Sequence, residues 1–196
     1  EGAVRPKELA ALARESGMPA AAVTDTNNLF GVFEMSETLT KAGIQPIVGT
    51  LLSVEFAPRS PLQTGSRRKP PHLPLLVQNE AGYLNLTRLL SSAYLDVEAG
   101  DWAHVKADKL LSHSEGLIAL TGGPGGAINQ LLLDGQQDAA RAVLARLAAA
   151  FPNRLYVELQ RHGLPEERAA EDGLIDLAYE MGLPLVATND VHFGRA

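Results

Sequence analysis

Short apolar runs alternate with segments of helical periodicity along almost the whole of this 196-residue chain. Most of the runs at 20–23, 72–77, 117–120, 155–159 and 185–187 are apolar on both faces, as strands are when helices cover a parallel sheet. Read in order, the elements are helix, strand, helix, strand, strand, helix, strand, helix, helix, strand, helix and strand. This alternation predicts an α/β fold with a parallel sheet, in which 185–187 is a short buried strand.

End signals and apolar stripes place the helices. Asn79 is a good N-cap for a helix that runs to about Leu95, and Leu29, Phe33 and Leu39 set the helical spacing of an earlier one. The predicted helices cover 6–16, 29–42, 79–95, 127–133, 136–151 and 165–181, with a short one at 108–113 and a further strand at 45–56.

Neither a fixed-length repeat nor a low-complexity tract divides the chain, so we expect a single domain over residues 1–196. The alternation alone does not separate a closed barrel from an open sheet. The glycine-rich stretch 122–126 could cradle phosphate, but it lacks the lysine of a P-loop and the spacing of a dinucleotide fingerprint. The absence of a dinucleotide fingerprint favours a barrel.

Composition narrows the classes of function. The chain has no cysteine, which excludes disulfides and thiolate zinc sites and suits a cytoplasmic protein. Its apolar runs are too short to cross a membrane. The net charge of −6 makes the chain a poor independent DNA binder, because duplex affinity depends on neutralising phosphates. The basic triplet 67–69 has no interleaved aromatic residues, so we expect a solvated loop there.

Five polar side chains lie at the ends of predicted strands: Asp25, His72, His162, Asp190 and His192. The last two are two residues apart, so they face the same side if the final strand continues through them. Imidazoles and carboxylates without thiols suit Zn²⁺, Mn²⁺ or Fe²⁺ and hydrolytic phosphate chemistry. Ordinary structural roles, such as a helix cap or a turn, remain open for each of the five.

Six segments, which follow one another in a fixed order along the chain, point to a family more specifically than any of these single residues. They are VTDTNNLFG at 23–31, IQPIVG at 44–49, HLPLLVQNEAGYLNL at 72–86, GLIALTGG at 116–123, ELQRHGLP at 158–165 and ATNDVHF at 187–193. Together they resemble the PHP domain at the N-terminus of the bacterial replicative DNA polymerase III alpha subunit. The resemblance implies a distorted (β/α)7 barrel related to the TIM barrel. Its first strand is missing from this sequence, which we therefore expect to be a fragment of a longer polymerase chain, truncated at both ends.

The resemblance also implies a metal site. Intact members of the family hold up to three metal ions for phosphoester hydrolysis with a cluster of His, Asp, Glu and Cys ligands. Asp25, His72, Asp190 and His192 of this chain match ligand positions of that cluster.

Three further ligand positions have lost their ligand. Thr26 replaces a His, Leu51 replaces a Glu and Gly123 replaces a Cys. Leucine and glycine side chains donate nothing to a metal, and threonine is a weak neutral ligand. We therefore expect a remnant site that binds no cofactor tightly and holds at most one weak divalent ion of Zn, Mn or Mg.

The function implied by the resemblance is that of a structural module in DNA replication. The domain would support the polymerase core and dock the proofreading exonuclease subunit, while the rest of the parent chain carries the DNA contacts and the nucleotidyltransferase activity. The domain itself is expected to be catalytically inactive. Two alternatives stay open: a metal-dependent PHP phosphoesterase or exonuclease that uses the four surviving ligands, and an unrelated barrel enzyme supported only by the glycine-rich loop.

Overall fold

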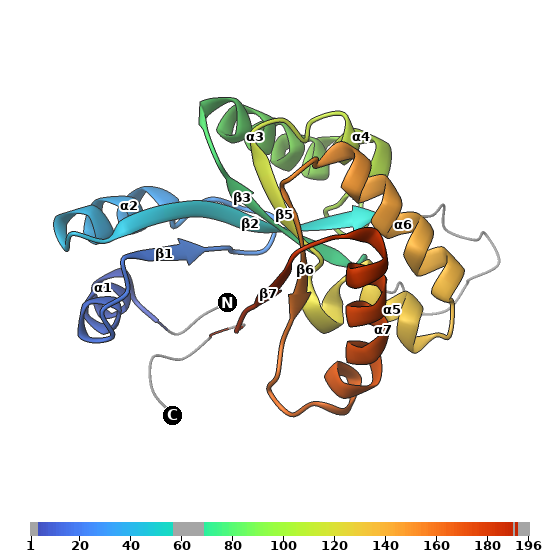
Figure 1. Cartoon of the computed structure of the whole chain (residues 1–196). Coiled ribbons are helices and arrows are strands. Elements are labelled where there is room, and N and C mark those ends of the chain that lie inside the picture. The colour runs from blue at the N-terminus through green and yellow to red at the C-terminus, as the bar shows by residue number, and fades with distance from the viewer. Residues whose placement is uncertain (1–3, 57–68, 190, 192–196) are drawn as a thin grey trace.

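The computed structural model describes residues 4–56, 69–189 and 191, which form a curled seven-stranded sheet flanked by helices (Figure 1). The strands are β1 (Ala20–Val23), β2 (Gln45–Glu55), β3 (His72–Val77), β4 (Val105–Lys106), β5 (Leu117–Leu120), β6 (Leu155–Leu159) and β7 (Leu185–Ala187). The helices are α1 (Pro6–Glu15), α2 (Val32–Lys41), α3 (Glu80–Leu95), α4 (Ala107–Leu111), α5 (Ala127–Leu133), α6 (Gln137–Ala150) and α7 (Pro165–Met181), with a 3₁₀ turn at Gly123–Gly125.

The sheet is mixed rather than parallel. Its strand order is β1-β2-β3-β5-β6-β7, and β4 pairs with β2 off this path. β3 runs antiparallel to both of its neighbours, whereas the other pairings are parallel. The prediction of a parallel sheet is therefore wrong for β3, because apolar residues on both faces report that a strand is covered and not which way it runs. In the described path β1 and β7 are the two edges, and the sheet forms a half-barrel.

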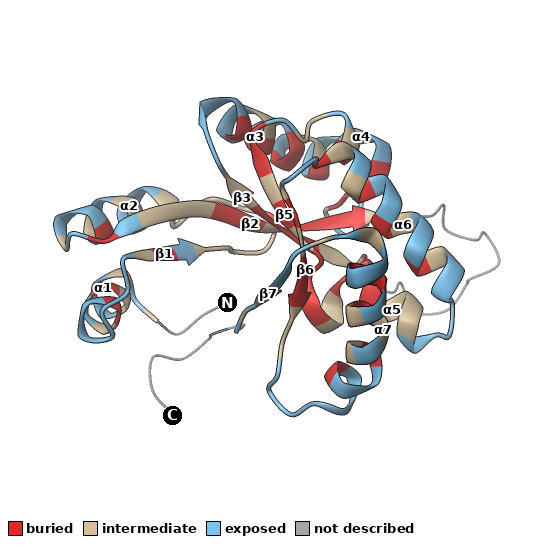
Figure 2. Ribbon diagram, in the orientation of Figure 1, coloured by how far each residue is buried: buried red, intermediate tan, exposed pale blue. Residues whose placement is uncertain are grey.

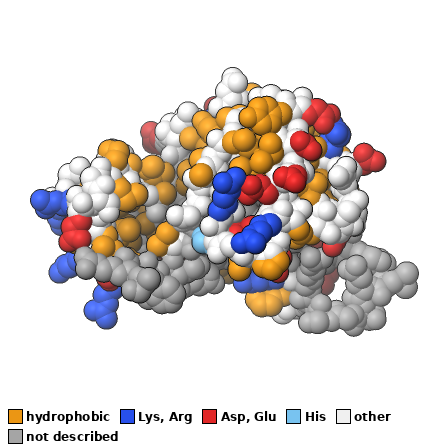
Figure 3. All heavy atoms as spheres, turned by 60° about the horizontal axis from the view of Figure 1, so that its bottom comes forward, with side chains coloured by type: hydrophobic (Ala, Val, Ile, Leu, Met, Phe, Trp, Pro, Cys, Tyr) orange, Lys and Arg blue, Asp and Glu red, His pale blue; other side chains and the backbone are white. Residues whose placement is uncertain are grey.

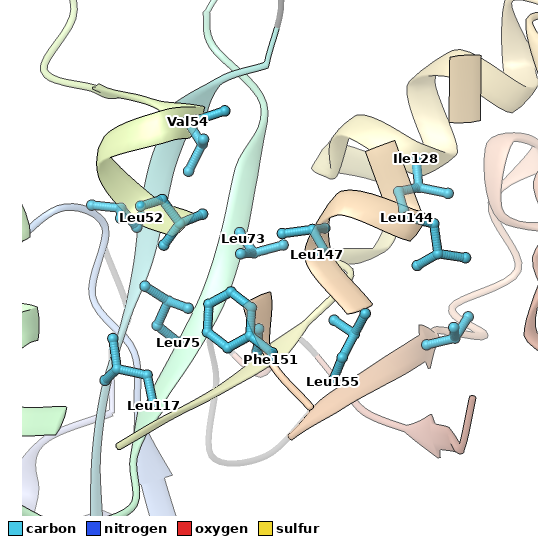
Figure 4. Packing of buried hydrophobic residues seen from close by; sticks show 14 of the residues in the cluster. Leu52, Val54, Leu73, Leu75, Leu117, Ile128, Leu144, Leu147, Phe151 and Leu155 are labelled. Carbon is cyan, nitrogen blue, oxygen red and sulfur yellow. The ribbon is translucent and has the colours of Figure 1, made fainter. Parts of the chain in front are cut away.

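Helices cover the convex face of β3, β5 and β6, and the main core lies between these helices and the strands (Figures 1 and 2). Leu73 and Leu75 of β3 point into this layer, where Leu147 and Phe151 come toward them from α6 and its C-terminal end (Figure 4). All four side chains are almost completely buried. We call this side of the strands the helix-covered face.

A smaller cluster joins α1, α2, β1 and the residue before β2; it consists of Ala10, Ala13, Ala21, Leu39 and Ile44. Here the predicted helix 29–42 begins too early, since α2 starts at Val32. Phe33, which was counted in its apolar spacing, is 78% exposed. In the preceding loop the Phe30 N–H donates to the Asn28 side chain and the Val32 N–H donates to the Leu29 carbonyl, and the helix begins only after these turns.

The last described strand pairs as expected but is not buried. β7 lies parallel to β6, with Val157 opposite Leu185. Leu185 and Ala187 are nevertheless exposed, so the prediction of a buried strand is wrong (Figure 2). Among the described residues β7 is an edge strand, so its side chains have a neighbouring strand on one side only.

The structure confirms the predicted N-cap of α3: the Asn79 side chain accepts a hydrogen bond from the Gly82 backbone N–H at 3.0 Å. The bounds of β3, β6, α5 and α7 agree with the predicted ranges. Over the described stretches of the chain, none of the helices combines the length and the apolar character needed to cross a membrane.

Candidate functional site

The concave face of the sheet forms a cavity of about 750 Å³. On the central strands its lining residues are every second residue, for example Leu76 of β3, Leu120 of β5 and Tyr156 of β6. These residues lie on the opposite side of the sheet from the core, because successive side chains of a strand alternate between its faces. We call this side the cavity face.

Polar groups collect at one rim of the cavity, where β5, β6 and β7 end and the antiparallel β3 begins. They are His72, Glu158, Gln160, His162, Thr188 and Asn189. In barrels built from parallel strands the carboxyl ends of the strands carry the functional groups. The half-barrel therefore gathers side chains that are far apart in the sequence at the edge where such folds build their sites.

Glu158 is the buried carboxylate of this rim, with 3% of its surface exposed. One carboxylate oxygen accepts a hydrogen bond from the Gly122 backbone N–H at 2.9 Å, and the other accepts from the Gln160 amide at 3.0 Å and from the Thr188 hydroxyl. The Glu158 N–H donates to the Thr121 hydroxyl oxygen at 2.9 Å. The protein itself thus supplies three donors to a charge that would otherwise be costly to bury.

A second carboxylate orients His162. Glu167 is 4% exposed and lies 2.6 Å from the His162 Nδ1, and its other oxygen accepts from the backbone N–H groups of His162 at 2.7 Å and Leu164 at 3.1 Å. Burial by itself raises the pKa of Glu167, but these hydrogen bonds and the nearby imidazole outweigh it and hold that pKa below its usual value. Because a carboxylate oxygen accepts, Nδ1 carries the proton and donates it to Glu167. His162 lines the cavity, and its other ring nitrogen, Nε2, takes no part in this hydrogen bond.

The predicted metal ligands are distributed unevenly. His72 lines the cavity. Asp25 is not among the lining residues, and its carboxylate lies beside Gly31 at the start of α2, 3.5 Å from where a Cβ would stand there. Asp190 and His192 lie outside the described residues. The metal-binding roles of these four residues remain predictions.

The structure shows the surroundings of the three positions at which the sequence predicts a lost family ligand. Leu51 lines the cavity with a hydrocarbon side chain. Gly123 has a φ of +50°, and a Cβ there would come within 2.6 Å of the Gln160 amide. Thr26 forms an isolated parallel bridge with Leu51. Within 4–56, 69–189 and 191, no three His, Cys, Asp or Glu side chains gather as a metal site would require.

Of the six rim residues, sequence reasoning named His72 and His162 and missed the other four. It also missed Glu167, which contacts His162 beside the rim. Glu158 could have been found, because it is the single charged residue of the otherwise apolar run 155–159. Glu167 gave no such signal, since an acidic residue in the first turn of a helix is ordinary. Its contact with His162 exists only because the chain turns back between β6 and α7.

The fold and the rim together define an α/β protein of the half-barrel type with its site at the strand ends. The chain belongs to the PHP domain family, whose family model, "PHP domain", matches residues 1–162. This finding confirms the family resemblance seen in the sequence. The single-domain extent over residues 1–196 stays a prediction.

Several curated polymerases are similar to this chain. DNA polymerase III subunit alpha of Caulobacter vibrioides is 46% identical over 195 residues, which is 100% of this chain and 17% of the relative. The Thermus aquaticus subunit is 37% identical over 201 residues, covering 100% of this chain and 16% of that protein. An error-prone DNA polymerase of Symbiobacterium thermophilum is 39% identical over 207 residues, covering 98% of this chain and 18% of that protein. The chain thus spans about a sixth of the length of the curated relatives it matches.

Two solved structures share the fold at low sequence identity. One is a candidate metal-dependent phosphoesterase from Bifidobacterium adolescentis, with a TM-score of 0.60 and 15% identity over 99% of this chain and 85% of that one. The other is an amidohydrolase from Chromobacterium violaceum, with a TM-score of 0.62 and 15% identity over 98% and 84%. They confirm the PHP-type, TIM-like α/β fold.

Proposed function

We propose that this chain is the PHP domain of the alpha subunit of a bacterial DNA polymerase III and serves there as a structural and docking module in replication. The observation that carries the proposal is the 46% identity to the Caulobacter vibrioides alpha subunit over the full length of this chain. Nucleotidyl transfer and DNA contact belong to the rest of the parent chain, in keeping with the net charge of −6 of these residues.

The cavity rim supports a module without phosphoesterase activity of its own. A hydrolytic site with two or three dications needs several anionic or imidazole ligands held close together. Leu51 contributes none, the Gln160 amide occupies the space beside Gly123, and Glu158 already receives three hydrogen bonds from the protein. A weak divalent ion at the remaining ligands is the most that we propose.

The proofreading exonuclease subunit is the proposed partner. Co-purification from cells that express the full-length parent protein, with and without residues 1–196, tests this role. We expect the exonuclease to follow the full-length protein and to be lost when the domain is removed. Equal recovery with both proteins would remove the docking role and leave only support of the polymerase core.

Metal analysis separates this module from the phosphoesterase alternative. The full-length protein and its His72→Asn variant are dialysed against Zn²⁺ or Mn²⁺, and the bound metal is compared by elemental analysis. We expect the two proteins to differ by one weakly held ion or less. A wild-type excess of two tightly held ions would point to a two-metal phosphoesterase and overturn the assignment of an inactive domain.

A further inference from the structure

The cavity has the size and the wall of a site for a small organic molecule. Its volume of about 750 Å³ falls within the range of about 300–1,000 Å³ that is usual for such sites. Figure 3 shows the molecule from the side of the rim, with hydrophobic side chains between the left part, which in Figure 1 holds α1, α2 and β1, and the centre. The aliphatic side chains of the wall come from β2, β3, β5 and β7, and they are Leu51, Leu76, Ile118, Leu120 and Val186.

The charged groups around the cavity are carboxylates. Among the described residues that line it there is no lysine or arginine, whereas Glu158 is one of them. A second buried carboxylate, that of Glu167, lies 2.6 Å from Nδ1 of His162, which also lines the cavity. Buried charges interact more strongly than charges in water, because less solvent screens them. With neutral imidazoles, the site therefore favours a ligand whose polar head is positively charged.

Three polar groups of the cavity are left to accept hydrogen bonds from such a head. Because His162 donates its Nδ1–H to Glu167, Nε2 carries a lone pair, and none of the described residues donates to it. The Tyr156 hydroxyl on β6 is half-buried and also makes no hydrogen bond within the described part of the chain, although tyrosine hydroxyls usually find a partner when they are buried. The side-chain amide of Asn189, equally unpaired among the residues that the structure describes, adds a carbonyl oxygen at the rim.

We propose that the cavity binds a primary alkylamine in its ammonium form. The alkyl chain lies against the aliphatic wall formed by residues such as Leu76 and Leu120, and the head lies at the rim. An ammonium group has three N–H donors, which match the acceptors at His162, Tyr156 and Asn189. A carboxylate head would face the charge of Glu158, and a quaternary ammonium has no N–H to donate. This ligand site goes beyond the docking role, and its tests have readouts separate from co-purification of the exonuclease.

Filling the cavity tests where the ligand binds. Ala22 is exposed on β1 and lines the cavity, so Ala22→Trp places a large side chain there without changing the core. Octylamine binding to the full-length parent protein is measured by isothermal titration calorimetry. We expect Ala22→Trp to weaken binding about tenfold or more, since the alkyl chain loses its wall. The matched control is Ala142→Trp on the exposed side of α6, which should bind as the wild type does. No binding to the wild type, or equal affinity in Ala22→Trp, would overturn the proposal.

A comparison of head groups tests the chemistry. Octylamine, octyltrimethylammonium and octanoate share a chain and differ in the head, and we expect the wild type to bind them in that order of decreasing affinity. Tyr156→Phe removes only a hydroxyl that has no partner among the described residues, so the fold should be unaffected. It should weaken octylamine binding by about threefold to tenfold, the effect of one hydrogen bond, and leave octyltrimethylammonium unchanged. Tyr179→Phe, at a position 77% exposed on α7, is the control. Tighter binding of octanoate, or wild-type affinity for octylamine in Tyr156→Phe, would contradict the ammonium site.

Discussion

Two neighbouring leucines of β3 show how differently the two faces of one sheet are used. Leu75 is fully buried on the helix-covered face, whereas Leu76 lies on the cavity face and is only partly buried. Identical side chains one residue apart therefore have different roles. The helix-covered face holds the fold together, and the cavity face is left open for a site.

The chemistry of the two faces differs as well. The helix-covered face of β3 and β5 is hydrocarbon throughout, while the cavity face ends in the buried Glu158 and in His162. A packed core tolerates little change in volume. An open face tolerates more, so a change of residue at Leu51, which lines the cavity, disturbs the fold less than a change in the core.

The sharpest test of this comparison pairs Leu75→Ala with Leu76→Ala. We expect Leu75→Ala to lower the free energy of unfolding by about 3 kcal/mol or more, since it opens a void in a packed layer. Leu76→Ala should lower the free energy of unfolding by about 1 kcal/mol, because solvent in the open cavity can fill the space. Urea denaturation of both variants measures the difference. Equal losses would show that the cavity face is as tightly packed as the core.

A second pair of variants compares what an added methyl group would meet at two glycines. In Gly82→Ala the new Cβ would come within 1.9 Å of the Gly116 carbonyl oxygen, which is backbone. In Gly125→Ala it would come within 2.1 Å of the His72 ring, a side chain beside the cavity that can turn away. We expect Gly82→Ala to lower the free energy of unfolding by about 2–3 kcal/mol and Gly125→Ala to lower it by less than about 1 kcal/mol. Thermal unfolding ranks the two variants, and the reverse order would contradict the comparison.

Glu158→Gln probes the polar rim of the cavity face. In the variant the amide nitrogen, a donor, would face the hydrogen-bond donors of Gly122, Gln160 or Thr188. We therefore expect the free energy of unfolding to fall by about 2 kcal/mol. The control is Glu180→Gln, which removes half of an exposed ion pair with Arg141 and should cost about 0.5 kcal/mol or less. If the two variants unfold at the same urea concentration, the Glu158 network does not stabilise the rim.

The smallest expected effect is a dependence of stability on pH through Glu167. Its folded pKa is lowered, so its stabilising contribution is complete above the unfolded pKa of about 4.3 and is lost as the pH falls through the folded value. Unfolding measured between neutral and strongly acidic pH should show a steeper acid decline for the wild type than for Glu167→Gln. Parallel pH profiles would show that the contact with His162 contributes nothing to the fold.

Part of this structure was readable in the sequence because local patterns report local burial. The apolar runs at 155–159 and 72–77 and the cap at Asn79 placed their elements correctly. The six ordered segments identified the family. Phe33 and the start of α2 were misjudged because a periodic pattern does not reveal how long a loop keeps its own hydrogen bonds.

By itself, the sequence of this protein determined an α/β chain of the PHP family, since family membership depends on residue identity and local spacing. The loss of family ligands at Leu51 and Gly123 stays a prediction. Only the tertiary structure decided that β3 runs antiparallel, that β7 is an exposed edge, and which residues surround His162. The physical reason is that strand direction, edge position and side-chain partners depend on contacts between segments far apart in the chain, which no local periodicity encodes.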